Sequence, residues 1–230
     1  MKKITTTFIL MTCLFLSGFG QNAGNSLELV NGPVIFTNSG LSDDFSRLQY
    51  FTVEMWIKPT GVTDNQKLMS QIGSDFESGF ILGIDQGQLD FEVFDDEGNK
   101  DQLKGGTLVA GEWQHVAVVY FYIEDIELYI NGELVASKEA TLASSNLTED
   151  ATSDVYIGTA SWDGVSFKYK GEMDEIRYWD WDLSQGEIAK WMNIEAVQPT
   201  AKGVHPREQY LKLYLKCDEA TGNFLIDSSP

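Results

Sequence analysis

Alternating and continuous runs of hydrophobic residues predict β-strands separated by short turns. From Phe51 to Lys58 the side chains alternate, which is typical of a strand with one buried face. Val116 to Ile123 is an unbroken run of β-branched and aromatic residues, which predicts a strand covered on both faces. Asn131-Gly132 lies between two further apolar runs. It indicates a tight hairpin, because a type I′ turn needs positive φ at both central residues.

Eight further segments show strand-like patterns and are separated by turn sequences rich in Gly, Asp and Asn. They are Leu27 to Val30, Val34 to Phe36, Lys67 to Ile72, Gly79 to Ile84, Gln88 to Phe94, Leu103 to Val109, Asp154 to Gly158 and Phe167 to Trp181. One helix is expected over 184–196, since Ser184 and Glu187 form a capping box and Ile188 and Trp191 follow at helical spacing. This order of elements predicts an all-β fold, a two-sheet antiparallel β-sandwich or jelly roll with one short C-terminal helix.

The first twenty residues have the pattern of a short bacterial export signal. Lys2 and Lys3 form a basic start, and an apolar run from Phe8 to Phe19 follows. We expect a signal peptide at residues 1–20, cleavage before Gln21, and a secreted or cell-surface protein without membrane insertion. The alternative, an uncleaved anchor, is disfavoured because the run is shorter than the roughly 20 residues that a span needs.

Charge and cysteine content narrow the possible partners and the source of stability. The net charge is −19, and cleavage of the signal would make it more negative. This argues against nucleic acid or an anionic membrane as a partner, because phosphate binding needs a basic patch. The predicted mature chain keeps only Cys217, which cannot form an internal disulfide and is expected to be a small buried side chain on a strand.

Four segments resemble the signature blocks of the laminin-G-like, concanavalin A-like jelly-roll domain. In chain order they are FTVEMWIKP (Phe51 to Pro59), GEWQHVAVVY (Gly111 to Tyr120), LYINGELVAS (Leu128 to Ser137) and GEMDEIRYWDWDLSQGEI (Gly171 to Ile188). The resemblance covers about residues 26–196 and implies a two-sheet antiparallel jelly roll. It also implies a recognition module of an exported protein that binds glycans or proteins, often with one structural calcium ion.

The end of the chain departs from a single domain of this kind. We expect the jelly-roll domain at 26–196, a linker at 197–209, and at 210–230 a strand that resembles the start of a second module. Either the natural chain continues beyond Pro230, or this strand packs back on the first domain.

The resemblance suggests one calcium site. Asp174 stands where related jelly rolls have a calcium ligand, and the segment around Glu28 and Gly32 is where they supply backbone carbonyls. Calcium takes six to eight oxygen ligands, many of them carbonyls. The alternative for Asp174 is an ordinary solvated or hydrogen-bonded acid.

Two patterns could indicate catalysis, and neither is complete. His115 could act as a general base, but no Ser or Cys nucleophile motif accompanies it, and the Trp113-x-His115 pattern resembles a structural feature of the family. Asp90 and Glu92 would share one face of a strand, but the Glu-x-Asp-x-Glu pattern of related glucanases is absent. We therefore expect a protein that is not an enzyme.

Aromatic and acidic residues near a predicted loop are the candidates for ligand contact. Trp162, Asp163 and Tyr169 are expected to bind ligand, because aromatic rings stack on sugar rings. We predict a secreted, non-catalytic module that binds a polysaccharide or other glycan. The alternatives are an adhesion or structural module that binds a cell-surface protein, and an accessory module of a glycoside hydrolase.

Overall fold

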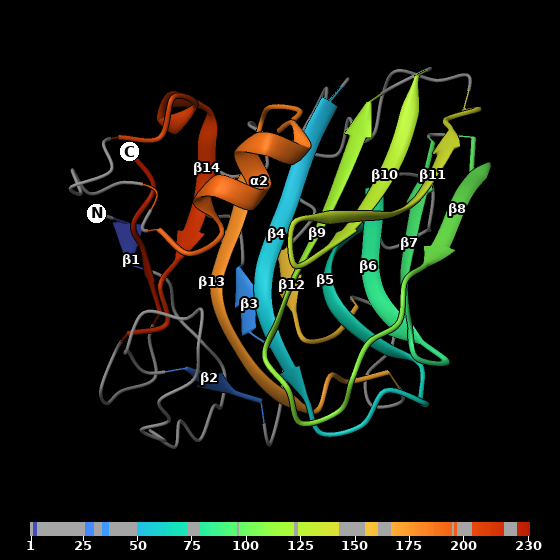
Figure 1. The fold of residues 1–230 in the computed structure, drawn as a ribbon, viewed down its shortest axis with the longest axis horizontal. Helices are drawn as coiled ribbons and strands as arrows, with labels where there is room; N and C mark the ends of the chain where they lie inside the picture. Colours follow the sequence, from blue (N-terminus) through green and yellow to red (C-terminus); the bar gives the residue numbers. More distant parts are fainter. Residues whose placement is uncertain are drawn as a thin grey trace.

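The structure is a computed structural model that describes residues 2–3, 26–29, 34–36, 50–72, 79–95, 97–121, 124–142, 155–160, 167–194, 196, 204–218 and 225–230. Over these residues the chain forms two antiparallel sheets packed face to face, and one short helix lies against the outer face of the larger sheet (Figure 1). This confirms the predicted two-sheet jelly-roll sandwich.

The larger sheet has nine strands in the order β1–β15–β14–β13–β4–β9–β10–β11, and β2 also pairs with β13. The strands are β1 (Lys2–Lys3), β2 (Leu27–Glu28), β4 (Tyr50–Pro59), β9 (Gln114–Phe121), β10 (Asp125–Ile130), β11 (Glu133–Glu139), β13 (Gly171–Trp179), β14 (Leu211–Leu215) and β15 (Ile226–Asp227).

The smaller sheet has six strands in the order β3–β12–β5–β6–β7–β8. They are β3 (Val34–Phe36), β5 (Gln66–Ile72), β6 (Gly79–Asp85), β7 (Gln88–Phe94), β8 (Lys100–Gly105) and β12 (Val155–Ile157). The predicted strand over Leu103 to Val109 instead ends at Gly105, and Gly106 follows with φ of +75°.

The main core lies between the two sheets, and the alternation of β4 supplies its centre. Phe51, Val53, Met55 and Ile57 are fully buried there. The other face of β4 was expected to be polar and open, yet Thr52 and Glu54 are buried too. The reason is that the helix and the C-terminal segment cover this face through a second cluster, listed here: Ala117, Val119, Tyr129, Trp179, Leu183, Ile188, Ala196, Leu211 and Tyr214.

The helix α2 spans Gln185–Trp191, and its start is as predicted. Ser184 accepts from the Glu187 backbone N–H, and the Glu187 carboxylate accepts from the Ser184 N–H, which completes the capping box. The helix ends earlier than residue 196. The carbonyls of Trp191, Met192 and Ile194 instead accept hydrogen bonds from the side chains of Arg177 and Trp56, at 2.8–3.3 Å.

The hairpin between β10 and β11 has the predicted two-residue turn. Asn131 and Gly132 have φ of 52° and 79°, the signs that a type I′ turn requires. Gly132 also lies against the helix, since an added Cβ would come within 2.9 Å of Ala189.

The C-terminal segment belongs to the same sheet as the rest of the domain. β14 pairs with β13, and β15 pairs with β14, so the strand at 210–230 packs back on the first domain. Residues 204–209, expected in a linker, also contact the domain, because His205 is buried between Trp179 and Trp191. Cys217 is fully buried, as predicted, but it lies beyond the end of β14 at Leu215 and has φ of +55°, so it is not a strand residue.

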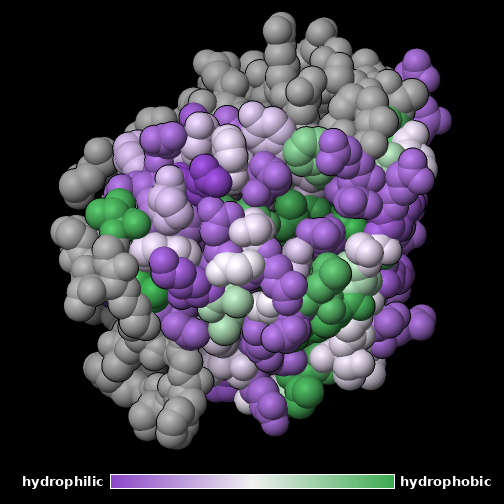
Figure 2. Space-filling view, turned by 45° about the horizontal axis from the view of Figure 1, so that its top comes forward, coloured by the Kyte–Doolittle hydropathy of each residue, from purple (hydrophilic) through white to green (hydrophobic). Residues whose placement is uncertain are grey.

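Most of the predicted signal peptide lies outside the described residues. Within it, only Lys2–Lys3 is described, as a short strand paired with β15. Among the described residues no helix has the length and apolar character needed to cross a membrane. The face shown in Figure 2 is largely hydrophilic, with hydrophobic residues in separate patches, as expected for a strongly acidic chain.

Candidate functional site

A pocket of about 310 Å³ lies where β4 ends and β13 begins, near β2, at the lower end of the sandwich in Figure 1. We call it the edge pocket. Its lining comprises Glu28, Leu29, Lys58, Pro59, Thr60, Gly111, Lys170, Gly171 and Glu172. Four separate segments of the chain therefore meet at this site.

Three charged side chains lie next to one another across the strands at the edge pocket. Glu172 of β13 is opposite Glu28 of β2 on one side and opposite Lys58 of β4 on the other. Cross-strand neighbours of this kind share one face of a sheet. The Lys58 Nζ lies 2.8 Å from Glu172 Oε1, and Ser26 Oγ donates to Glu172 Oε2 at 2.8 Å.

An aromatic ring continues this row. The Lys58 ammonium lies 5.9 Å from the centre of the Trp113 ring, which is only partly buried. Glu28, Glu172, Lys58 and Trp113 together form what we call the edge row. It combines two carboxylates, an ammonium and an indole, so it offers hydrogen-bond acceptors, donors and an apolar ring face side by side.

Backbone hydrogen bonds fix the walls of the edge pocket. The Thr60 N–H donates to the Lys170 carbonyl at 2.9 Å, and the Gly111 N–H donates to the Pro59 carbonyl at 2.7 Å. The Leu29 N–H donates to the Gly171 carbonyl at 3.2 Å, which holds the segment after β2 in place. The backbone around the pocket is thus held by its own hydrogen bonds, which lowers the ordering cost of binding.

Tyr169 lies beneath the edge pocket rather than in it. Its ring is 1% exposed, and its hydroxyl donates to the Glu172 carbonyl at 3.0 Å. Burial raises the pKa of this hydroxyl well above its usual value. A buried ring offers no face to a sugar, so the structure gives Tyr169 a supporting role instead of the predicted ligand contact.

Gly171 allows β13 to pack closely against β4 and against the Tyr169 hydroxyl. Its φ is +151°, and an added Cβ would lie 2.3 Å from the Lys58 carbonyl and 2.7 Å from the Tyr169 hydroxyl. Only glycine fits here, and any larger residue would push β13 away from β4 at the edge pocket.

Three predicted site residues lie outside the described residues: Trp162, Asp163 and Gly32. The predicted calcium ligand Asp174 is described. It is buried on β13, and its Oδ1 accepts from the Glu175 N–H at 2.9 Å, where the strand bulges.

The described residues were compared with the side-chain clusters that hold metal ions. Among them, no group of three or more Asp, Glu, His or Cys side chains is arranged to hold a metal ion. Glu28, predicted to contribute its carbonyl to the calcium site, lines the edge pocket, and its role as a calcium ligand stays a prediction.

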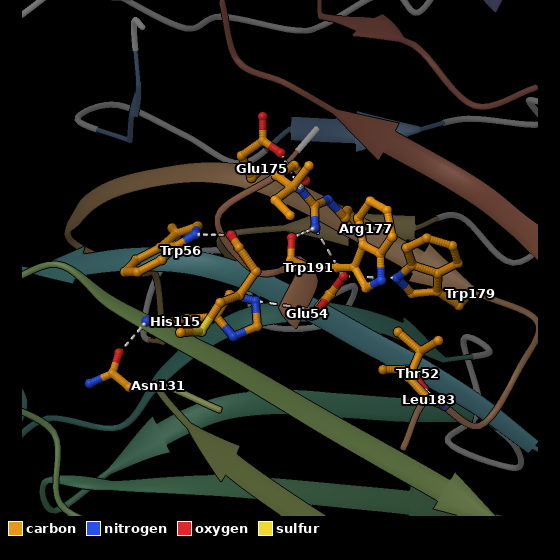
Figure 3. Close-up of polar contacts among 12 residues, drawn as sticks. Thr52, Glu54, Trp56, His115, Asn131, Glu175, Arg177, Trp179, Leu183 and Trp191 are labelled. Carbon is orange, nitrogen blue, oxygen red and sulfur yellow. Dashed lines mark hydrogen bonds and ion pairs between the residues drawn. The ribbon is translucent and has the colours of Figure 1, made fainter. Parts of the chain in front are cut away.

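His115 is part of a buried polar network on the outer face of the larger sheet (Figure 3). Its Nε2 lies 3.3 Å from Glu54 Oε2, while Glu54 Oε1 accepts from Arg177 at 3.2 Å and from the Trp179 indole at 3.0 Å. Arg177 also pairs with Glu175. Because His115 is 1% exposed, it cannot reach a substrate in solution. The network joins the sheet to the segment around α2.

Asp90 and Glu92 share the outer face of the smaller sheet, as predicted from their spacing. Each has a lysine partner, since Lys104 Nζ lies 3.5 Å from Asp90 and Lys100 Nζ lies 2.9 Å from Glu92. Gln102 also donates to Asp90 at 2.7 Å. Glu92 is thus a partly exposed charge paired with Lys100, whereas Asp90 is 2% exposed and is held by Lys104 and Gln102.

Sequence patterns missed most of the edge row. Lys58 and Glu172 occupy the ends of recognisable strands, and Trp113 was assigned to a structural pattern. One sequence feature could have indicated this site: Lys58 and Glu172 occupy non-core positions of their strands. The register of β13 and β4 shows that these two positions are paired.

Comparison with solved structures supports the fold. A serum-amyloid-P-like pentraxin of Limulus polyphemus superposes with a TM-score of 0.55 and 16% identity, over 81% of this chain and 82% of that chain. The CBM40 module of the Ruminococcus gnavus IT-sialidase, bound to α2,3-sialyllactose, superposes with a TM-score of 0.59 and 21% identity. The match covers 72% of this chain and 95% of the CBM40 chain.

A botulinum neurotoxin type C structure, described as dependent on two ganglioside molecules for cell entry, is also similar. Its TM-score is 0.58 at 17% identity. The match covers 80% of this chain and 44% of the toxin chain. A search of curated protein sequences found no match. At these identities the solved structures establish the fold alone.

A family model gives the classification. The model described as the concanavalin A-like lectin/glucanases superfamily, of the laminin G type, matches residues 32–189, which is well over half of the chain. That range includes the four sequence blocks and all of the edge row except Glu28. The protein therefore belongs to the concanavalin A-like lectin/glucanases superfamily.

Proposed function

We propose that this domain is a non-catalytic binding module that holds a sugar of a glycan in the edge pocket. The observation that carries the proposal is the edge row, in which Glu172 and Lys58 line the edge pocket and Trp113 lies next to Lys58. Two similar structures are described with sialyllactose and with gangliosides, which supports the same class of ligand.

The chemistry of the edge row suits a sugar ring. Neighbouring hydroxyls on a sugar can each donate and accept a hydrogen bond. The Glu172 carboxylate accepts only, and the Lys58 ammonium donates only, so the two together can bind a pair of hydroxyls. The apolar face of the ring can then stack on the exposed part of Trp113. At about 310 Å³ the pocket is at the small end of ligand sites, which fits one or two sugar rings.

The same proposal includes export and a structural calcium ion. Export rests on the signal-like residues 1–20, and calcium rests on Asp174 and on the family resemblance. In this role the domain would bind glycan outside the cell and leave any chemistry to other proteins or domains.

A glycan array followed by calorimetry tests the proposal. The purified protein should bind at least one oligosaccharide, and Lys58→Met or Trp113→Ala should weaken that binding by about tenfold or more, as loss of one buried contact of about 1.4 kcal/mol would. Lys100→Met is a matched control, since Lys100 forms a similar ion pair with Glu92 at 2.9 Å on the other sheet. The proposal fails if no glycan binds, or if Lys58→Met and Lys100→Met bind it equally well.

A further inference from the structure

Two carboxylates face each other across β2 and β13 at the edge pocket. Glu28 and Glu172 are direct partners in the antiparallel register, and both line the pocket. Like charges directly opposite each other destabilise a sheet. Sequences that break such a rule commonly do so at functional sites. The pair therefore calls for a partner that neither strand supplies.

The surrounding groups compensate only Glu172. Lys58 and Ser26 both contact the Glu172 carboxylate, each at 2.8 Å. No hydrogen bond or ion pair joins the Glu28 side chain to another residue in the described part of the chain. Its carboxylate is therefore available to a ligand in the edge pocket.

The second lysine of the pocket, Lys170, is strongly exposed to solvent. Lys170 lies 3.8 Å from Asp64, and their side chains are 69% and 74% exposed, so water screens both charges strongly. Lys58 is already paired with Glu172. Glu28 is thus the pocket carboxylate without an ion-pair partner among the described residues, and the net charge of −19 on the whole chain has the same sign.

We infer that the edge pocket selects uncharged sugars over acidic ones, with Glu28 as the specificity-determining residue. This inference rests on the proposed function. An ionised carboxylate only accepts hydrogen bonds, so Glu28 can bind sugar hydroxyls, whereas a carboxylate or sulfate on the ligand would place a second negative charge next to the unpaired Glu28. Discrimination by repulsion of this kind is a common source of specificity.

The inference distinguishes this protein from the CBM40 module to which it is similar. That module is bound to α2,3-sialyllactose, a glycan with a carboxylate. If a ligand carboxylate came within about 5 Å of Glu28, Coulomb repulsion would weaken its binding between about fourfold and a few hundredfold, for effective dielectric constants of about 80 and 20.

Matched pairs of glycans test the inference. One pair is lactose and α2,3-sialyllactose. The other is a galacturonan oligosaccharide in its methyl-esterified and its free form. The members of each pair differ chiefly in the acidic group. Calorimetry should show the neutral member of a bound pair binding at least about fourfold tighter. Glu28→Gln should bring the ratio close to one by strengthening binding of the acidic member. Glu124→Gln, which changes an exposed acid outside the edge pocket, should leave the ratio unchanged.

The outcomes separate the two proposals. Tighter binding of the acidic member, or a ratio that Glu28→Gln does not change, overturns the inference while glycan binding stands. If no glycan on the array binds, the proposed function fails and the inference fails with it. Melting curves supply a further readout, because Glu28→Gln removes a like-charge contact and should not lower the melting temperature. A clear loss of stability would show that Glu28 is instead a structural acid.

Discussion

Replacing Glu54 by glutamine should destabilise the domain strongly. The Glu54 carboxylate is buried and contacts His115, Arg177 and Trp179 (Figure 3). Removing one partner from a buried ion pair costs about 3–5 kcal/mol, because the other charge stays buried. In a domain of this size about 1 kcal/mol changes the melting temperature by roughly 2–4 °C, so Glu54→Gln should lower it by about 6–20 °C.

The same carboxylate should make stability depend on pH. Burial by itself would raise the pKa of Glu54, but the hydrogen bond from His115 and the charge of Arg177 together lower it from 4.5 to about 2. A folded-state pKa below the unfolded one stabilises the folded protein above about pH 4.5, and the stabilisation is lost as the pH falls toward 2. This difference corresponds to about 3 kcal/mol.

Urea unfolding followed by tryptophan fluorescence measures both effects. Wild type and Glu54→Gln should differ by about 3–5 kcal/mol at pH 7 and by clearly less near pH 2, the folded-state pKa of Glu54, where most of its stabilisation is lost. Glu124→Gln, at an exposed position, is the matched control. A difference below about 1 kcal/mol at pH 7, or one that does not shrink in acid, would refute the role assigned to the buried network.

Two other predictions concern folding and metal. Gly132→Val should lower stability by at least about 2 kcal/mol in thermal melts, because a β-branched residue is strained at φ of 79° and its Cβ would contact Ala189; an unchanged melting temperature would contradict this. If Asp174 binds calcium, a hundredfold excess over Kd stabilises the fold by about 2.7 kcal/mol, so calcium should raise the melting temperature and chelator should reverse the rise. Asp174→Ala should abolish this response and Asp163→Ala should not; identical melting of metal-stripped wild type in calcium and in chelator would rule the site out.

Elements whose signal is local could be predicted from the sequence. The Asn131-Gly132 turn, the Ser184–Glu187 capping box and the inward positions of β4 each depend on a few neighbouring residues, and the structure has all of them. Thr52 and Glu54 show where this reasoning stops. Their burial depends on α2 and the C-terminal segment, which meet β4 only in the folded chain.

The edge row could not be predicted because it depends on register between distant strands. Glu28 and Glu172 are 144 residues apart in number yet directly opposite in the sheet. Tyr169 was chosen for its ring, but its exposure is set by contact with Gly171 and Glu172. A polar side chain at a strand end has no distinctive sequence pattern, so only the paired strands reveal Lys58 as a site residue.

The position of a bound sugar tests the central claim most directly. In a ¹⁵N-labelled sample titrated with an oligosaccharide identified on the array, each tryptophan indole N–H gives its own signal. We predict that the Trp113 signal shifts with the binding curve, because its ring lies in the edge row beside Lys58. The signals of the buried Trp179 and Trp191 should stay in place. A shift confined to Trp162, with none at Trp113, would place the sugar at the predicted loop instead and would contradict the edge pocket as the binding site.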